Sequence, residues 1–261
     1  MGLLLKAGIK GDLINSAVLA FTTITFFIVC INYIPSLKNI FPNYSLQLAG
    51  LIGNTSFLGI PIAIALLPTE TINFTIGFDL GTTLFSWIFG PYLLEKRGNN
   101  NSFLNFRKLV SSIFESPASR GILGVLIIYR FGLEDIMVDF LWIPARLVIC
   151  LAIIVVGTRL GIITNSKKVK FKFKENIKYS LYLKLLILPM FVYLICRILN
   201  FEEIETTALV LQAGTPSAIS TILLAEAYKR ERELAAKAFF KNTIVSTATI
   251  PILFLLINSK S

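Results

Sequence analysis

Two long apolar segments of this chain are interrupted near their middle by glycine, proline and small polar residues. The interruptions read GNTSFLGIP from Gly53 to Pro61 and QAGTPSA from Gln212 to Ala218. Backbone that leaves its helix inside a bilayer exposes N–H and C=O groups that lipid cannot satisfy. It is tolerated where it is buried in protein or lines a watery cavity. Paired interruptions in two halves of a membrane protein point to the substrate site of a transporter.

The composition is that of an integral membrane protein. Of the 261 residues, 55% are hydrophobic and 15% are charged, whereas about a quarter of a soluble domain is charged. Because a span needs ~20 apolar residues, we expect an all-α, multi-pass protein of the cell membrane, embedded in the lipid bilayer. It has about eight transmembrane helices, near 12–34, 45–67, 71–94, 117–131, 138–160, 177–199, 204–228 and 234–257.

The net charge of +10 is distributed by loop. Basic residues gather in alternate connections, for example from Lys167 to Lys178 and from Lys229 to Lys241, while acidic residues fill turns such as Glu202–Glu205. The positive-inside rule places the basic loops in the cytoplasm. The pattern therefore reports membrane topology, and we expect no nucleic-acid partner.

The sequence lacks the residue types or spacings that several kinds of enzyme and metal site require. Histidine is absent, and the three cysteines lie in apolar segments without metal-ligand spacing. No pair of carboxylates falls at one depth of the predicted spans. We therefore expect no cofactor, no metal site and no enzyme activity.

The motifs resemble those of one known family. Residues 53–61 resemble the fourth-helix motif of the auxin efflux carriers, and Thr215–Ala218 with Leu224–Tyr228 resembles the ninth helix. Ser246–Pro251 is similar to the last helix. The resemblance implies a carrier built from two inverted five-helix repeats, whose broken helices cross at the substrate site. Family members include plant auxin exporters and bacterial carriers for small carboxylates such as malate, and relatives can form homodimers.

The resemblance also divides the chain. Residues 1–96 would form an incomplete N-terminal repeat, 97–116 a cytoplasmic linker and 117–261 a C-terminal five-helix repeat. The first helix and most of the second are missing from this plan, and Gly2–Gly8 corresponds to the tail of the second. We expect a misplaced start codon, with ~50 further residues upstream; the alternative is a true eight-helix variant.

The two interruptions supply the predicted substrate site. Thr215 and Pro216 read as a helix N-cap and first helical residue, and Pro61 is interpreted in the same way, with Gly59 relaxing the backbone before it. Two half-helices would then point their N-termini at one site, which favours an anion such as a carboxylate. The alternative is a pair of ordinary proline kinks. The predicted substrate-binding residues are Gly53, Asn54, Thr55, Pro61, Gln212, Gly214, Thr215, Pro216 and Ser217.

Asp79 lies near the middle of a predicted span, where a carboxylate costs ~2.5–3.5 kcal/mol on insertion scales. It is a candidate for proton coupling, or an acceptor that holds the broken helix; the structural alternative is a pairing with a threonine or a backbone N–H. We expect it to face the interior, with Gly77 and Gly81 allowing a helix to come close. Lys184 lies nearer a span end, and we expect it to extend toward the interface.

These features favour a secondary active transporter that moves a small organic anion by alternating access, with protons as a candidate coupling ion. The alternatives are a non-transporting membrane sensor or scaffold, and an inactive truncated carrier.

Overall fold

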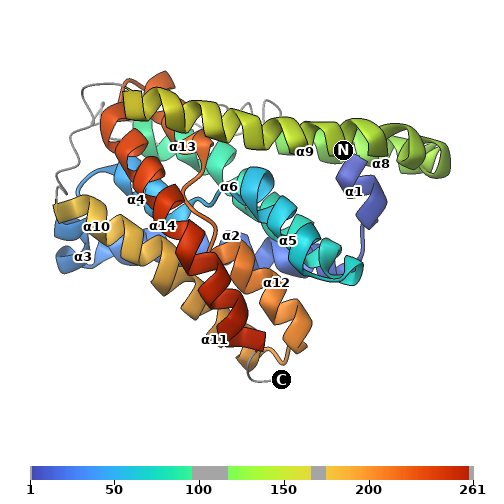
Figure 1. Cartoon of the computed structure of the whole chain (residues 1–261), viewed down its shortest axis with the longest axis horizontal. Helices are drawn as coiled ribbons and strands as arrows, with labels where there is room; N and C mark the ends of the chain where they lie inside the picture. The colour runs from blue at the N-terminus through green and yellow to red at the C-terminus, as the bar shows by residue number, and fades with distance from the viewer. Residues whose placement is uncertain (1, 96–116, 166–174, 259–261) are drawn as a thin grey trace.

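Helices form every regular element in the described residues. The structure is a computed structural model and describes residues 2–95, 117–165 and 175–258 (Figure 1). The predicted linker 97–116 lies outside the described residues. The division into two repeats therefore stays a prediction.

The continuous helices are α1 (Gly2–Ala7), α2 (Gly11–Tyr33), α3 (Pro35–Ile40), α6 (Ile72–Glu95), α8 (Pro117–Arg130), α9 (Glu134–Asn165) and α14 (Arg232–Asn258). Of these, α2, α6, α8 and α14 match predicted spans closely, α9 extends beyond its predicted span at both ends, and the short α1 and α3 correspond to no predicted span. The sixth predicted span consists of α10 (Glu175–Tyr182), the π-helical turn η3 (Leu183–Ile187) and α11 (Leu188–Ile198). Within the described residues, three helical stretches are long and apolar enough to cross a membrane on their own: Gly11–Tyr33, Asn176–Ile198 and Arg232–Asn258.

Both interrupted segments are broken as the sequence predicts. The first consists of α4 (Tyr44–Leu51), the π-helical turn η1 (Thr55–Gly59) and α5 (Ile60–Leu66), and a short 3₁₀ turn, η2 (Thr69–Thr71), leads into α6. The second consists of α12 (Glu203–Ala213) and α13 (Ile219–Ala227). The start of α12 is defined by a capping box, in which the Glu202 N–H donates to the Glu205 carboxylate at 3.0 Å.

Close packing of α2 on α6 positions α6 beside the two breaks. A Cβ at Gly77 would lie 2.3 Å from the carbonyl oxygen of Leu13, and a Cβ at Gly81 would lie 2.1 Å from that of Ala17. Both positions must therefore be glycine for the backbones to approach. The predicted helix contact at this Gly-x-x-x-Gly pair is confirmed.

Apolar side chains cover the outside, and polar ones gather within. α9 runs along one edge of the molecule with α8 at its end (Figure 1) and exposes Ile136, Phe140, Ile143, Leu147 and Leu151. This is the surface expected of a helix that faces lipid. The buried polar residues near the two breaks are Asn54, Thr55, Lys184, Gln212, Thr215, Ser217 and Asn242. A polar interior of this kind directs the search for a site to the breaks.

Candidate functional site

The two breaks meet and pair through their backbones. The Asn54 N–H donates to the Pro216 carbonyl at 2.7 Å, and the Ala218 N–H donates to the Ile52 carbonyl at 2.9 Å. Gly53 and Ser217 form an antiparallel bridge between these bonds. Groups freed by one break are thus satisfied by the other, as burial requires. This geometry is a crossing of two extended segments, which ordinary proline kinks do not produce.

Two glycines of the first break make room for the second. A Cβ at Gly53 would lie 2.5 Å from the Thr215 hydroxyl oxygen and 2.9 Å from Lys184 Nζ. Gly59 has helical dihedral angles (φ −63°, ψ −50°), so the prediction that it relaxes the backbone is wrong. Its Cβ would lie 2.2 Å from Gln212 Oε1. Both glycines therefore serve close approach.

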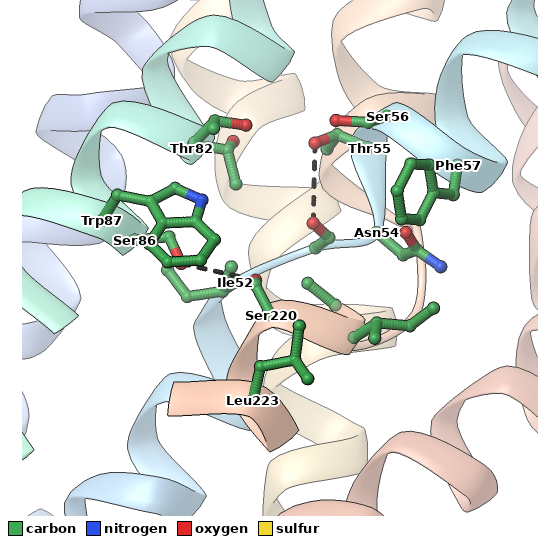
Figure 2. A pocket seen from close by; sticks show the side chains of 14 residues that line it. Ile52, Asn54, Thr55, Ser56, Phe57, Thr82, Ser86, Trp87, Ser220 and Leu223 are labelled. Carbon is green, nitrogen blue, oxygen red and sulfur yellow. Dashed lines mark hydrogen bonds between the residues drawn. The ribbon is translucent and has the colours of Figure 1, made fainter. Parts of the chain in front are cut away.

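A cavity of about 320 Å³, here named the crossing cavity, lies beside the first break (Figure 2). This volume is at the lower end of the range for small-molecule sites. Its lining residues are Ile52, Gly53, Asn54, Thr55, Ser56, Phe57, Thr82, Thr83, Ser86, Trp87, Ala218, Ile219, Ser220 and Leu223. Seven of these 14 residues carry a side-chain hydroxyl or amide, and none of the described lining residues carries a charge.

The first turns of two half-helices line the cavity. One begins at Thr55 and the other at Ile219, with Ser220 following. The first N–H groups of a helix have no acceptor within it, and that end carries a partial positive charge. In the wall of the cavity, the Ser86 and Ser220 hydroxyl groups are joined by a hydrogen bond of 3.4 Å (Figure 2). The site therefore offers donors and positive potential to an anion.

Asn54 adds an amide to these donors. Its side chain is 3% exposed, and within the described residues its Nδ2 has no hydrogen-bond partner. An unpartnered buried amide costs about 1–3 kcal/mol. A side chain that lines a cavity in this state is suited to donating to a bound anion.

The second break is built differently from the prediction. α13 begins at Ile219 with Ala218 as its N-cap residue, so the N-cap role of Thr215 and the first-position role of Pro216 are wrong. The reason is the crossing itself, because the Asn54 N–H bonds the Pro216 carbonyl and holds the chain extended. The Thr215 hydroxyl instead donates back to the Gln212 carbonyl at 2.7 Å.

The first break also starts its second half earlier than expected. η1 begins at Thr55 and runs directly into α5, so Pro61 lies inside the half-helix and does not open it. A proline inside a helix removes one backbone hydrogen bond, and the π-helical turn η1 ends at Gly59, directly before α5.

Of the nine predicted substrate-binding residues, three line the crossing cavity: Gly53, Asn54 and Thr55. The other six lie outside its lining: Pro61, Gln212, Gly214, Thr215, Pro216 and Ser217. Ser217 is fully buried, donates to the Ala49 carbonyl and accepts from the Asn242 amide. This side chain ties α4 and α14 to the crossing.

Sequence reasoning missed the hydroxyls that line the opposite wall. Thr82, Thr83 and Ser86 come from α6, and Ser220 comes from α13. A signal was present, because polar residues recur at 75, 79, 82 and 86, the spacing of one helix face.

Asp79 holds the first break from that same face. Its Oδ1 accepts hydrogen bonds from the Thr55 hydroxyl at 2.6 Å and the Ser56 hydroxyl at 2.5 Å. The expectation that Asp79 faces the interior is confirmed. The bonds match its predicted role as an acceptor that holds the broken helix.

Lys184 is the clearest departure from expectation. Its side chain is 1% exposed, and its Nζ donates to the Ala213 carbonyl at 2.6 Å, so the prediction that it extends to the interface is wrong. The π-helical turn η3 places it against the crossing. A lysine inside a span costs ~2.5–3.5 kcal/mol, and a cation at a helix C-terminus recovers about 0.3–1 kcal/mol. The contact with α12 offsets only part of that cost.

The known proteins to which this chain is similar are described as transporters. The sequence profile of the family described as "Membrane transport protein" matches residues 108–254, more than half of the chain, including the second break. An uncharacterized transporter of Methanocaldococcus jannaschii is 24% identical over 219 residues, covering 82% of this chain and 70% of that protein. An uncharacterized transporter of Methanothermobacter thermautotrophicus is 25% identical over 209 residues, covering 80% and 66%.

Proposed function

The chain belongs to the membrane transport protein family of auxin efflux carriers, and we propose that it is a secondary carrier for a small organic anion such as a carboxylate. It would lie in the cell membrane as a multi-pass protein. Membership of this family makes the chain a membrane transporter, and the class of substrate is what we propose.

The observation that carries the proposal is the crossing cavity. It combines the first turns of two half-helices, the buried Asn54 amide and several hydroxyls, and its described lining residues carry no acidic side chain. A carboxylate could accept hydrogen bonds from the Asn54 amide and from the first N–H groups of the half-helices. The Thr55 and Ser56 hydroxyls are not available to it in this arrangement, because they donate to Asp79. It would also be stabilised by the partial positive charge at the start of η1 and of α13.

The mechanism proposed is alternating access. The crossing joins segments from distant parts of the chain by two backbone hydrogen bonds, those of Asn54 and Ala218. The helices on one side of the crossing would rock against those on the other side, with the crossing as a fixed point. This motion would open the cavity to each face of the membrane in turn.

Asp79 is the proposed coupling residue. It lies next to the cavity without lining it, and its bonds to Thr55 and Ser56 link its carboxylate to the wall that would hold the substrate. Protonation of Asp79 would remove its charge beside that wall. If Asp79→Asn protein takes up substrate with the same dependence on a pH gradient as wild type, the coupling role is rejected.

The test of function is uptake of labelled malate, lactate and acetate by proteoliposomes, with and without a pH gradient. We expect saturable uptake of at least one probe, reduced at least about tenfold in Asn54→Ala because a hydrogen bond to a charged group is lost. The matched control is Asn32→Ala, which removes an asparagine of α2 that bonds Gln47 away from the cavity. Its uptake should stay near that of wild type.

Uptake that is equal in wild type and Asn54→Ala would contradict the proposed site. Folded wild-type protein that takes up none of the probes would instead favour the sensor or scaffold.

A further inference from the structure

The ammonium group of Lys184 is buried behind the crossing cavity. Its Nζ donates to the carbonyl oxygen of Ala213, the last residue of α12. Among the described residues, no ion pair joins Lys184 to a carboxylate. An ammonium has three donors. A cationic side chain inside a membrane protein commonly marks a substrate or ion pathway.

Gly53 separates this ammonium from the cavity. A Cβ at Gly53 would lie 2.9 Å from Lys184 Nζ, so the two are in direct contact. Gly53 and Thr82 line both the crossing cavity and a void of about 10 Å³ beside Lys184. Because Gly53 has no side chain, only its backbone separates Lys184 Nζ from the crossing cavity at this point.

The field of Lys184 therefore reaches the cavity. The crossing is surrounded by apolar side chains and lipid, where charges interact several times more strongly than in water. No described lining residue is charged. The Asp79 carboxylate, which accepts from the Thr55 and Ser56 hydroxyls of the wall, acts on the cavity with the opposite sign, so the contribution of Lys184 is measured with Asp79 kept in place. The positive charge of Lys184 adds to that of the two half-helix N-termini.

We propose that Lys184, in its protonated form, determines the charge selectivity of this carrier: it raises affinity by the same factor for each negative charge on the substrate and so favours dicarboxylates over monocarboxylates of the same shape. The inference rests on the proposed function, since it assigns the substrate charge at that site. Two unit charges about 12 Å apart in a medium with an effective dielectric constant of about 20 change affinity about tenfold. We expect an effect of this size for each substrate charge.

The test uses three probes of one shape. Succinate carries two negative charges, succinamate one and succinamide none, and each is used to inhibit uptake of labelled malate by proteoliposomes. In Lys184→Met, which keeps a long side chain without the charge, the inhibition constant should rise about 100-fold for succinate and about tenfold for succinamate. It should not change for succinamide. If malate uptake is too slow to measure, the increase in the melting temperature of the purified protein that each probe produces gives the affinity ratios among the probes.

Two further variants isolate the charge. Lys237→Met removes a lysine that pairs with Glu233 at 2.6 Å, and the ratios among the probes should stay those of wild type. Lys184→Arg keeps the positive charge and should preserve the preference for succinate.

The outcomes separate this inference from the proposed function. An equal rise for all three probes, or none, in folded Lys184→Met overturns the charge role and leaves the lysine a structural cap of α12. Wild-type protein that takes up no probe overturns the proposed function first, before any variant is compared.

Discussion

The two breaks of the crossing are alike in sequence and are used differently. In the first, Asn54 and Thr55 face the cavity and Asp79 holds the turn in place. In the second, Thr215 folds back onto Gln212, and Ser217 is bonded to Ala49 and Asn242. The first break presents ligand groups, whereas the polar side chains of the second hold the fold together.

The difference follows from where each helix resumes. η1 starts directly after Asn54, so the polar residues of the first break fall in its opening turn beside the cavity. α13 starts only at Ile219, so Thr215 and Ser217 remain in the segment before it, where Ser217 bonds residues of α4 and α14 and Thr215 bonds Gln212 of α12. In this protein the first break places its polar side chains beside the cavity because its second half-helix begins directly after Asn54.

Glycine substitutions give the sharpest contrast between the breaks. Gly53→Ala would place a methyl against Thr215 and Lys184, which are both held by hydrogen bonds and cannot yield. We expect a loss of about 3 kcal/mol in stability and loss of transport. The measurements are thermal unfolding of the purified protein and malate uptake.

Gly214→Ala is the matched control in the second break. Its methyl would meet the end of the Leu253 side chain at 2.8 Å, which can move aside. We expect a cost of at most about 1 kcal/mol. Equal losses at the two glycines would contradict the crowding described at Gly53.

Polar substitutions should separate stability from transport. Ser217→Ala removes a donor to Ala49 and an acceptor for Asn242 in a fully buried place, so we expect about 2 kcal/mol of destabilisation. Asn54→Ala removes an amide whose Nδ2 is unpartnered among the described residues, so we expect almost unchanged thermal unfolding but reduced uptake. The reverse pattern would mean that the roles assigned to the two breaks are exchanged.

Substitutions at Asp79 probe how the first break is held. Asp79→Ala leaves the Thr55 and Ser56 hydroxyls without their acceptor, and we expect a loss of about 1–2 kcal/mol in thermal unfolding experiments. Asp79→Asn retains an oxygen that can accept both bonds. Its stability should stay within about 1 kcal/mol of wild type, and a large loss there would show that the charge itself holds the turn.

Proline substitutions should have the smallest effect. Pro61→Ala falls in the first turn of α5, where alanine is accepted, so the cost is about 0.4–1 kcal/mol through the greater entropy of the unfolded chain. Pro216→Ala keeps the carbonyl that bonds Asn54, and a similar cost is expected. A much larger loss at Pro216 would assign its ring a packing role in the crossing.

Prediction from the sequence succeeded where local patterns decide. The positions of the helices, the two breaks and the inward direction of Asp79 follow from runs of apolar residues, from glycine and proline, and from the cost of a buried charge. It failed at Lys184 and Thr215, because the residues that surround them come from α12 and from Gly53 and Asn54 of the first break, far away in the chain. Hydropathy averaged over a span cannot tell a lysine at the interface from one turned inward by a π-helical turn.

The sequence by itself determined that the chain is a helical membrane protein with two broken spans, since these properties depend on composition and on residues near one another. The tertiary structure decided which polar groups face the cavity. Ser86 and Ser220 meet in its wall although 134 positions separate them. The physical reason is that backbone pairing of Gly53 with Ser217 sets the register of both half-helices. That register, together with the packing of α6 against η1 and α13, selects which side chains line the site.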